Sequence, residues 1–103
     1  MKKIILTFFL LVTSAIASAG GDFRGKINFL EFYQGHTGLL INMENMADPD
    51  GCGRSELFIL PETHPHYKDI YALLLAQRFN EGVIRVVTSG CHQGLPSIVH
   101  VFV

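Results

Sequence analysis

The only two cysteines of the chain, Cys52 and Cys91, enclose a predicted strand–helix–strand unit. Between them lie an apolar run at 57–60, a helical pattern at 67–79 and a run rich in branched residues at 83–88. Redox and metal sites favour a close pair such as C-x-x-C, whereas a distant crosslink stabilises a domain with a small core. We therefore predict a disulfide between the two cysteines that holds both ends of this unit together.

The first 19 residues have the pattern of an export signal. Two lysines precede an apolar segment at 4–12, and the small residues at 17–19 form a cleavage site. The apolar segment is shorter than the roughly 20 residues of a transmembrane helix, so we expect no stable membrane insertion; an uncleaved anchor is the alternative. The mature chain is expected to begin at Gly20 and to be secreted or periplasmic, where oxidising conditions favour a disulfide.

Residues 20–103 are expected to form a single domain. Of the eight Lys and Arg residues, two lie in the leader, which leaves six against nine Asp and Glu and a net charge of −3 with neutral histidines. Nucleic-acid-binding domains normally carry a basic surface, so this balance argues against a nucleic-acid partner.

Five segments rich in branched and aromatic residues are expected to form strands at 26–33, 39–43, 56–60, 83–88 and 97–103. A helix is expected at 67–79, with Pro65 in its first turn and Gly82 as its C-cap residue. This order is that of the OB-fold, a five-stranded Greek-key β-barrel with its helix between strands three and four. We therefore predict an α+β chain, an OB-fold-like β-barrel with one helix. A small open sheet with one covering helix is the alternative.

The predicted helix is apolar around most of its circumference. Its apolar residues are Tyr67, Ile70, Tyr71, Ala72, Leu73, Leu74, Leu75, Ala76 and Phe79. A small sheet covers only one side of a helix, so we expect a second packing partner. That partner is either another copy of the chain, which gives a homo-oligomer, or the loop at 44–54, held over the helix by Cys52.

The passage from Tyr71-Ala72-Leu73-Leu74-Leu75-Ala76 to Gly82-Val83-Ile84-Arg85-Val86 resembles the helix-to-strand passage in receptor-binding (B) subunits of pentameric A–B toxins, of the subtilase-cytotoxin and pertussis type. It is also similar to a broad set of small exported bacterial proteins. The likeness covers most of residues 20–103 by architecture, while the matching motif is mainly core packing. It implies an OB-fold and a non-catalytic subunit that binds a glycan or a protein receptor. It assigns no sugar-contacting residue to this chain.

An OB-fold commonly binds ligands at the loops between strands one and two and between strands four and five. These loops are expected here at 33–38 and 90–96. The candidate ligand-binding residues in them are Tyr33, His36, His92 and Gln93. Aromatic and amide groups suit contacts with sugars, because pockets combine apolar faces with a few placed polar groups. The alternative is that all four are ordinary turn residues.

No catalytic or metal-binding motif stands out in the sequence. His64 and His66 have the spacing i, i+2, which does not place them on one helix face as in a zinc helix. The run at 48–51 resembles a calcium loop, but Cys52 stands where an oxygen ligand is needed. Oxidised cysteines leave no thiolate nucleophile. We expect no enzyme activity, no metal and no cofactor, and the alternative function is a periplasmic protein-interaction or accessory protein.

Overall fold

The computed structural model describes residues 20–103, and their elements follow the predicted order. The elements are β1 (Gly21–Glu31), β2 (Gly38–Met43), β3 (Phe58–Pro61), α1 (Tyr67–Asn80), β4 (Val83–His92) and β5 (Leu95–Phe102). The predicted leader and its cleavage residue Ala19 lie outside the described residues. Among residues 20–103, no helix combines the length and the hydropathy that crossing a membrane requires.

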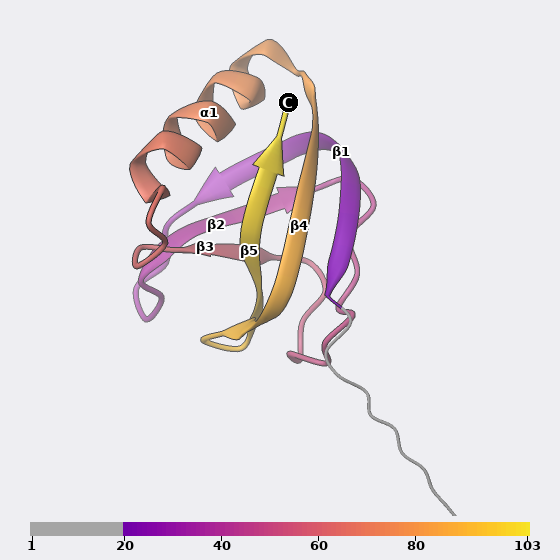
Figure 1. Ribbon diagram of the computed structural model, residues 1–103, viewed down its shortest axis with the longest axis vertical. Helices are drawn as coiled ribbons and strands as arrows, with labels where there is room; N and C mark the ends of the chain where they lie inside the picture. The colour runs from indigo at the N-terminus through magenta and orange to yellow at the C-terminus, as the bar shows by residue number, and fades with distance from the viewer. Residues whose placement is uncertain (1–19) are drawn as a thin grey trace, which may run out of the picture.

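The five strands form one sheet that closes into a ring (Figure 1). The order around the ring is β1-β2-β3-β5-β4, and β4 pairs with β1 to complete it. β3 and β5 are parallel and meet at Ile59 and Ser97, and all other neighbours are antiparallel. α1 packs at one end of the ring against β1 (Figure 1). The α+β class, with one helix between β3 and β4, is therefore confirmed.

The main apolar cluster is formed by alternate residues of the strands together with one residue of α1. Its buried members are Ile27, Leu39, Ile41, Met43, Phe58, Leu60, Leu74, Ile84, Val86 and Ile98. Successive side chains of a strand point to opposite faces, so Leu40 and Ile59 point away from this cluster. They form a second buried cluster with Leu57 and Leu95. β2 and β3 are thus buried on both faces, which explains their nearly continuous apolar sequences.

β1 begins at Gly21, earlier than the predicted start at Lys26. The extra residues pair with β4, in a register that runs from Gly21 opposite Thr88 to Lys26 opposite Val83. The glycines of this segment suggested a loop, but a Cβ at Gly25 would lie 2.8 Å from the Cβ of Glu44. Glycine is therefore needed here because the β2–β3 loop approaches the strand closely.

The predicted loop at 90–96 is also wrong in length, because β4 runs to His92 and β5 begins at Leu95. Only Gln93 and Gly94 remain between the strands, with φ angles of 53° and 81°. Two successive residues with positive φ are typical of a type I′ hairpin turn, whose twist matches that of the flanking strands. The candidate residues His92 and Gln93 therefore lie on a rigid hairpin instead of a longer loop.

Both ends of α1 differ from the prediction. The N-cap residue is His66, without a side-chain capping bond, so Pro65 precedes the helix. At the other end Glu81, and not Gly82, adopts the left-handed conformation with φ 53°. The Gly82 N–H donates to the Gln77 carbonyl at 3.0 Å, which satisfies one of the final carbonyls of the helix.

The predicted disulfide between Cys52 and Cys91 is present. It joins the β2–β3 loop to β4 at the end of the ring opposite α1 (Figure 1). Within this loop, the Asp48 carboxylate accepts the N–H groups of Cys52 and Gly53 at 2.7 and 2.8 Å. The loop therefore does not fold over the helix, and the interpretation that it covers the apolar face of α1 is wrong.

Candidate functional site

The β1–β2 and β4–β5 turns lie side by side because one glutamine joins them. Gln93 Oε1 accepts the Thr37 N–H at 2.8 Å, and Gln93 Nε2 donates to Thr37 Oγ1 at 3.0 Å. The two residues are 56 positions apart in the sequence. Figure 1 shows both turns at the end of the ring away from the carboxyl terminus. The two segments predicted to carry ligand-binding residues thus form one surface, the paired-turn surface.

The side chains of the other three candidate residues, Tyr33, His36 and His92, have no hydrogen bond within residues 20–103 that joins the two turns. Tyr33 is 50% exposed, and its backbone carbonyl accepts the His36 N–H at 3.2 Å. His36 and His92 are half-buried. His36 Nδ1 and His92 Nε2 are each buried without a hydrogen-bond partner among the described residues. An unsatisfied buried polar atom costs about 1–3 kcal/mol, so a polar partner at either nitrogen would be favourable.

The roles of the four candidate residues therefore separate. The Gln93 amide is engaged with Thr37 through both its oxygen and its nitrogen, which gives it a role in joining the turns. Tyr33 presents an exposed ring, whereas the two histidine nitrogens that lack partners are buried. The sequence could suggest these residue types in turns, but not that Thr37 occupies the amide.

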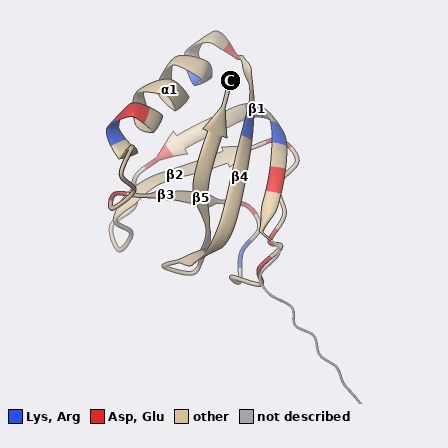
Figure 2. Cartoon of the chain, viewed as in Figure 1, with Lys and Arg blue, Asp and Glu red and all other residues tan. Residues whose placement is uncertain are grey.

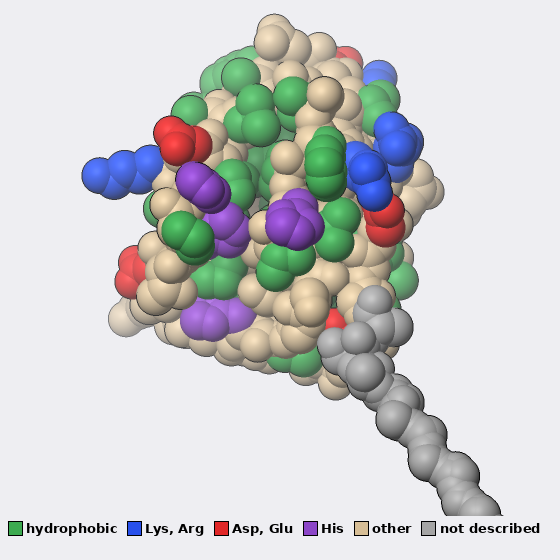
Figure 3. Space-filling view, viewed as in Figure 1, with side chains coloured by type: hydrophobic (Ala, Val, Ile, Leu, Met, Phe, Trp, Pro, Cys, Tyr) green, Lys and Arg blue, Asp and Glu red, His purple; other side chains and the backbone are tan. Residues whose placement is uncertain are grey.

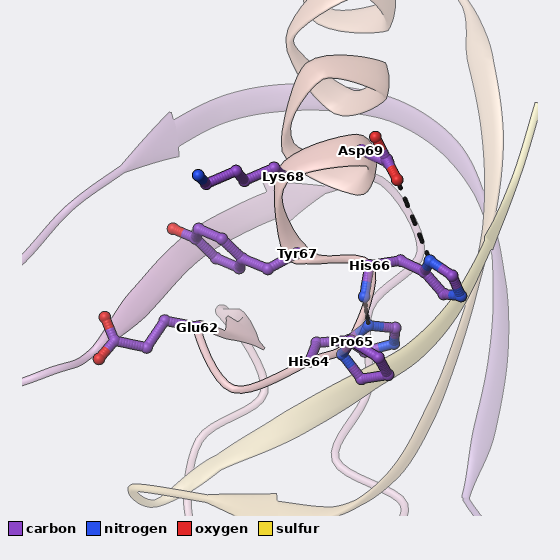
Figure 4. Close-up of a pocket in the computed structure, with 7 residues that line it drawn as sticks. All are labelled: Glu62, His64, Pro65, His66, Tyr67, Lys68 and Asp69. Atoms are coloured by element: carbon purple, nitrogen blue, oxygen red, sulfur yellow. Dashed lines mark hydrogen bonds and ion pairs between the residues drawn. The ribbon is translucent and has the colours of Figure 1, made fainter.

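A second surface surrounds the residues that precede α1 and its first turn (Figure 4). It is an open depression of about 430 Å³ lined by Glu62, His64, Pro65, His66, Tyr67, Lys68 and Asp69. In Figure 4 Glu62, Tyr67 and Lys68 point to one side, while His66 and Asp69 point to the other. The seven residues therefore do not converge on a common point.

His64 links the start of α1 to β5. Its Nδ1 accepts the His66 N–H at 3.0 Å, so the ring proton is on Nε2, which lies 3.0 Å from the Val99 carbonyl oxygen. The neutral Nε2–H tautomer is the one that makes both bonds. His66 is exposed, with its ring 4.0 Å from the Asp69 carboxylate. His64 is therefore a structural residue, while His66 lies free of the core.

A third surface lies on the outer face of β1, β4 and β5. It is an open depression of about 710 Å³ lined by Gly20, Gly21, Asp22, Val87, Thr88, Ser89, Val99 and His100. Beside it, the Arg85 guanidinium donates to both oxygens of Asp22, with Nε 2.9 Å from Oδ1 and Nη2 2.8 Å from Oδ2. Arg85 also lies 4.5 Å over the ring of Phe102. Figure 3 shows several histidine side chains on this face of the molecule.

Asp22 and Arg85 form an ion pair on this outer face, where Arg24 is also exposed. Hydrogen bonds from Arg85 hold the pKa of Asp22 below its ordinary value, and the same bonds raise the pKa of Arg85. No pattern in the sequence predicts this ion pair, because Asp22 and Arg85 come from different strands and only the register of β1 with β4 brings them together.

Charged side chains are dispersed over the helix, β1, β4 and the β2–β3 loop (Figure 2). β5 contains no Lys, Arg, Asp or Glu. Among residues 20–103, no group of three or more His, Cys, Asp or Glu side chains is placed to hold a metal ion. The segments 33–38 and 90–96 of the paired-turn surface contain no Lys, Arg, Asp or Glu, whereas Glu62, Lys68 and Asp69 line the depression before α1.

Comparison of the chain with protein-family models, with curated proteins and with solved structures finds no match. The resemblance to toxin B subunits therefore rests on the motif within residues 71–86 and on the order of the elements.

Proposed function

We propose that the mature chain is an exported, non-catalytic binding module of the OB-fold type, which binds a glycan or a glycosylated receptor at the paired-turn surface. Three features support the OB-fold: the strand order β1-β2-β3-β5-β4, the parallel contact of β3 with β5, and the helix between β3 and β4. The leader pattern supports export. The observation that carries the ligand surface is the two-bond pairing of Gln93 with Thr37, which joins the two turns.

The chemistry of the paired-turn surface suits a sugar. Sugars present apolar C–H faces together with hydroxyl groups, which both donate and accept hydrogen bonds. The exposed ring of Tyr33 offers an apolar face with a polar hydroxyl. The half-buried rings of His36 and His92 add aromatic and polar groups in the same two turns. Recognition of this kind needs no metal and no free charge.

Binding of the mature protein to an immobilised glycan panel tests this proposal. Tyr33→Ala and His92→Ala are each expected to weaken binding about tenfold, since one hydrogen bond or aromatic contact is worth about 1.4 kcal/mol here. His66→Ala is the matched control, because this exposed histidine lies outside the two turns. Equal losses for all three variants, or full binding by the Tyr33 and His92 variants, would contradict the assignment of the surface.

The exposed side of α1 supports a second candidate function, a periplasmic protein that binds another protein or another copy of itself. Leu74 is the one fully buried residue of α1. Phe79 is 79% exposed and Leu75 38%, and they share a ridge of the helix with Tyr71. The ring of Phe32 stacks on Tyr71 at 5.9 Å and extends the apolar area onto the residue that follows β1. A contiguous exposed apolar patch marks an interaction site.

Sedimentation velocity of the mature protein tests self-association through α1. The natural chain is expected to associate at micromolar concentration, and Phe79→Ser is expected to be monomeric with a stability within about 0.5 kcal/mol of the natural chain. Tyr33→Ser is the control, since Tyr33 is 50% exposed but belongs to the paired-turn surface. If the natural chain is a monomer at high micromolar concentration, self-association is excluded and only a different protein partner remains for this face.

A further inference from the structure

The Asp50 carboxylate lies beside the atom at which the predicted cleavage creates a new amino terminus. Asp50 Oδ1 accepts the Gly20 N–H at 3.1 Å, and Oδ2 accepts the Gly90 N–H at 2.7 Å. Both bonds are partly buried. The loop around Asp50 is fixed on both sides of this residue in the sequence. Asp48 accepts the Cys52 N–H, and Cys52 is joined to Cys91 by the disulfide. A rigid anion therefore faces the first nitrogen of the predicted mature chain.

The backbone at Gly20 is specific for glycine. A Cβ at this position would lie 2.5 Å from the Thr88 carbonyl oxygen, so a side chain requires a shift of the backbone. The close approach of Gly20 to β4, which places its nitrogen at Asp50, is therefore open to glycine alone.

We propose that Asp50 is the binding site of the mature α-ammonium group, so that removal of the leader adds an ion pair to the folded domain. The inference rests on the proposed export. An export endopeptidase hydrolyses the Ala19–Gly20 bond: the C–N bond breaks, water supplies a hydroxyl to the Ala19 carbonyl carbon and a proton to the Gly20 nitrogen. The resulting amine takes a further proton from solvent, because an α-amino group has a pKa of about 7.7–8.0.

Cleavage changes the strength of a contact that the fold already makes. A peptide N–H donates to the Asp50 carboxylate from an uncharged group, whereas an α-ammonium adds a positive charge and turns the same contact into an ion pair. The domain that begins at Gly20 is therefore more stable than the same domain with an additional residue or a blocking group at this nitrogen. Maturation and stability are coupled through a single carboxylate.

Asp22 of β1 and His100 of β5 are the other titratable groups that line the same depression as Gly20, and Asp48 lies in the same loop as Asp50. The ion pair raises the pKa of the folded amine above its unfolded value. Its contribution to stability is thus complete below about pH 7.7 and is lost as the pH rises through the folded value. Comparison of a free with an acetylated amino terminus isolates this group, because Asp48, Asp22 and His100 are common to both.

The test uses the mature chain from Gly20, with a free or an acetylated amino terminus, in the natural background and with Asp50→Asn. Asparagine keeps an oxygen acceptor for Gly90 but removes the charge. Acetylation is expected to lower the thermal unfolding midpoint by about 4 °C in the natural chain at pH 7, and to change it little in the Asp50→Asn chain or above pH 10. With Asp48→Asn, the control, the effect of acetylation is expected to persist.

Three results would overturn the proposal: no effect of acetylation in the natural chain, an equal effect with Asp50→Asn, or an exported protein whose mass shows a start other than Gly20. If Asp50→Asn does not fold, a chain that begins at Ala19 replaces it. The additional residue moves the amine by about 3.8 Å, so the midpoint is expected to fall as it does on acetylation. All of these are measurements of stability or mass, so they are independent of glycan binding at the paired-turn surface.

Discussion

Replacement of Cys52 and Cys91 together by serine is expected to lower the free energy of unfolding of the mature domain by about 4 kcal/mol. The disulfide closes a loop with a sequence separation of 39, and opening this loop gives the unfolded chain more conformational entropy. A domain of this kind has a total stability of about 5–15 kcal/mol, so the loss is a large part of the whole. Equilibrium unfolding in urea measures it.

The natural chain in reducing agent is the matched control for the serine variant. Both are expected to show the same fall in the urea midpoint with a similar dependence on denaturant. A loss below about 1 kcal/mol in both would contradict the expectation. It would mean that the hydrogen bonds of Asp48 and Asp50 hold the β2–β3 loop in the folded domain without the crosslink, or that the loop is already ordered in the unfolded ensemble.

The parts of the fold that follow from local patterns could be predicted from the sequence. In β2, every second residue points to the same face of the strand. Leu39, Ile41 and Met43 lie on one face and are buried in the main cluster, as their spacing predicts. The disulfide was predictable because the chain has only two cysteines and an export pattern. The start of β1 was not, because Gly21 and Gly25 read as loop residues, while their real role is to admit the neighbouring backbone and side chains.

The relations between distant residues could not be predicted, and these relations define the candidate sites. Gln93 and Thr37 are 56 positions apart, and Asp22 and Arg85 are 63 apart. Each pair depends on which strands are neighbours and in what register, which no local pattern contains. The residue type of Gln93 predicted contact with a ligand, but in the structure its side-chain amide is hydrogen-bonded to Thr37.

The largest effect of a single substitution is expected at Leu74. Leu74→Ala is expected to lower the free energy of unfolding by about 3 kcal/mol, because it leaves a cavity in the main cluster. Leu75→Ala is the matched control: it removes the same atoms from the next residue of the same helix, with the same change in helix propensity. Leu74 is fully buried and Leu75 is 38% exposed, so the control is expected to lose less than about 1 kcal/mol. Urea unfolding of the two variants measures the difference.

The same pair of variants also reports whether α1 has a partner in solution. A partner copy over the exposed ridge would bury Leu75, and its stabilising effect would grow with protein concentration. The cost of Leu75→Ala is then expected to rise between low and high micromolar protein, while the cost of Leu74→Ala stays constant. Equal costs for the two leucines at every concentration would contradict the structure itself, because they would require Leu75 to be buried within a single chain.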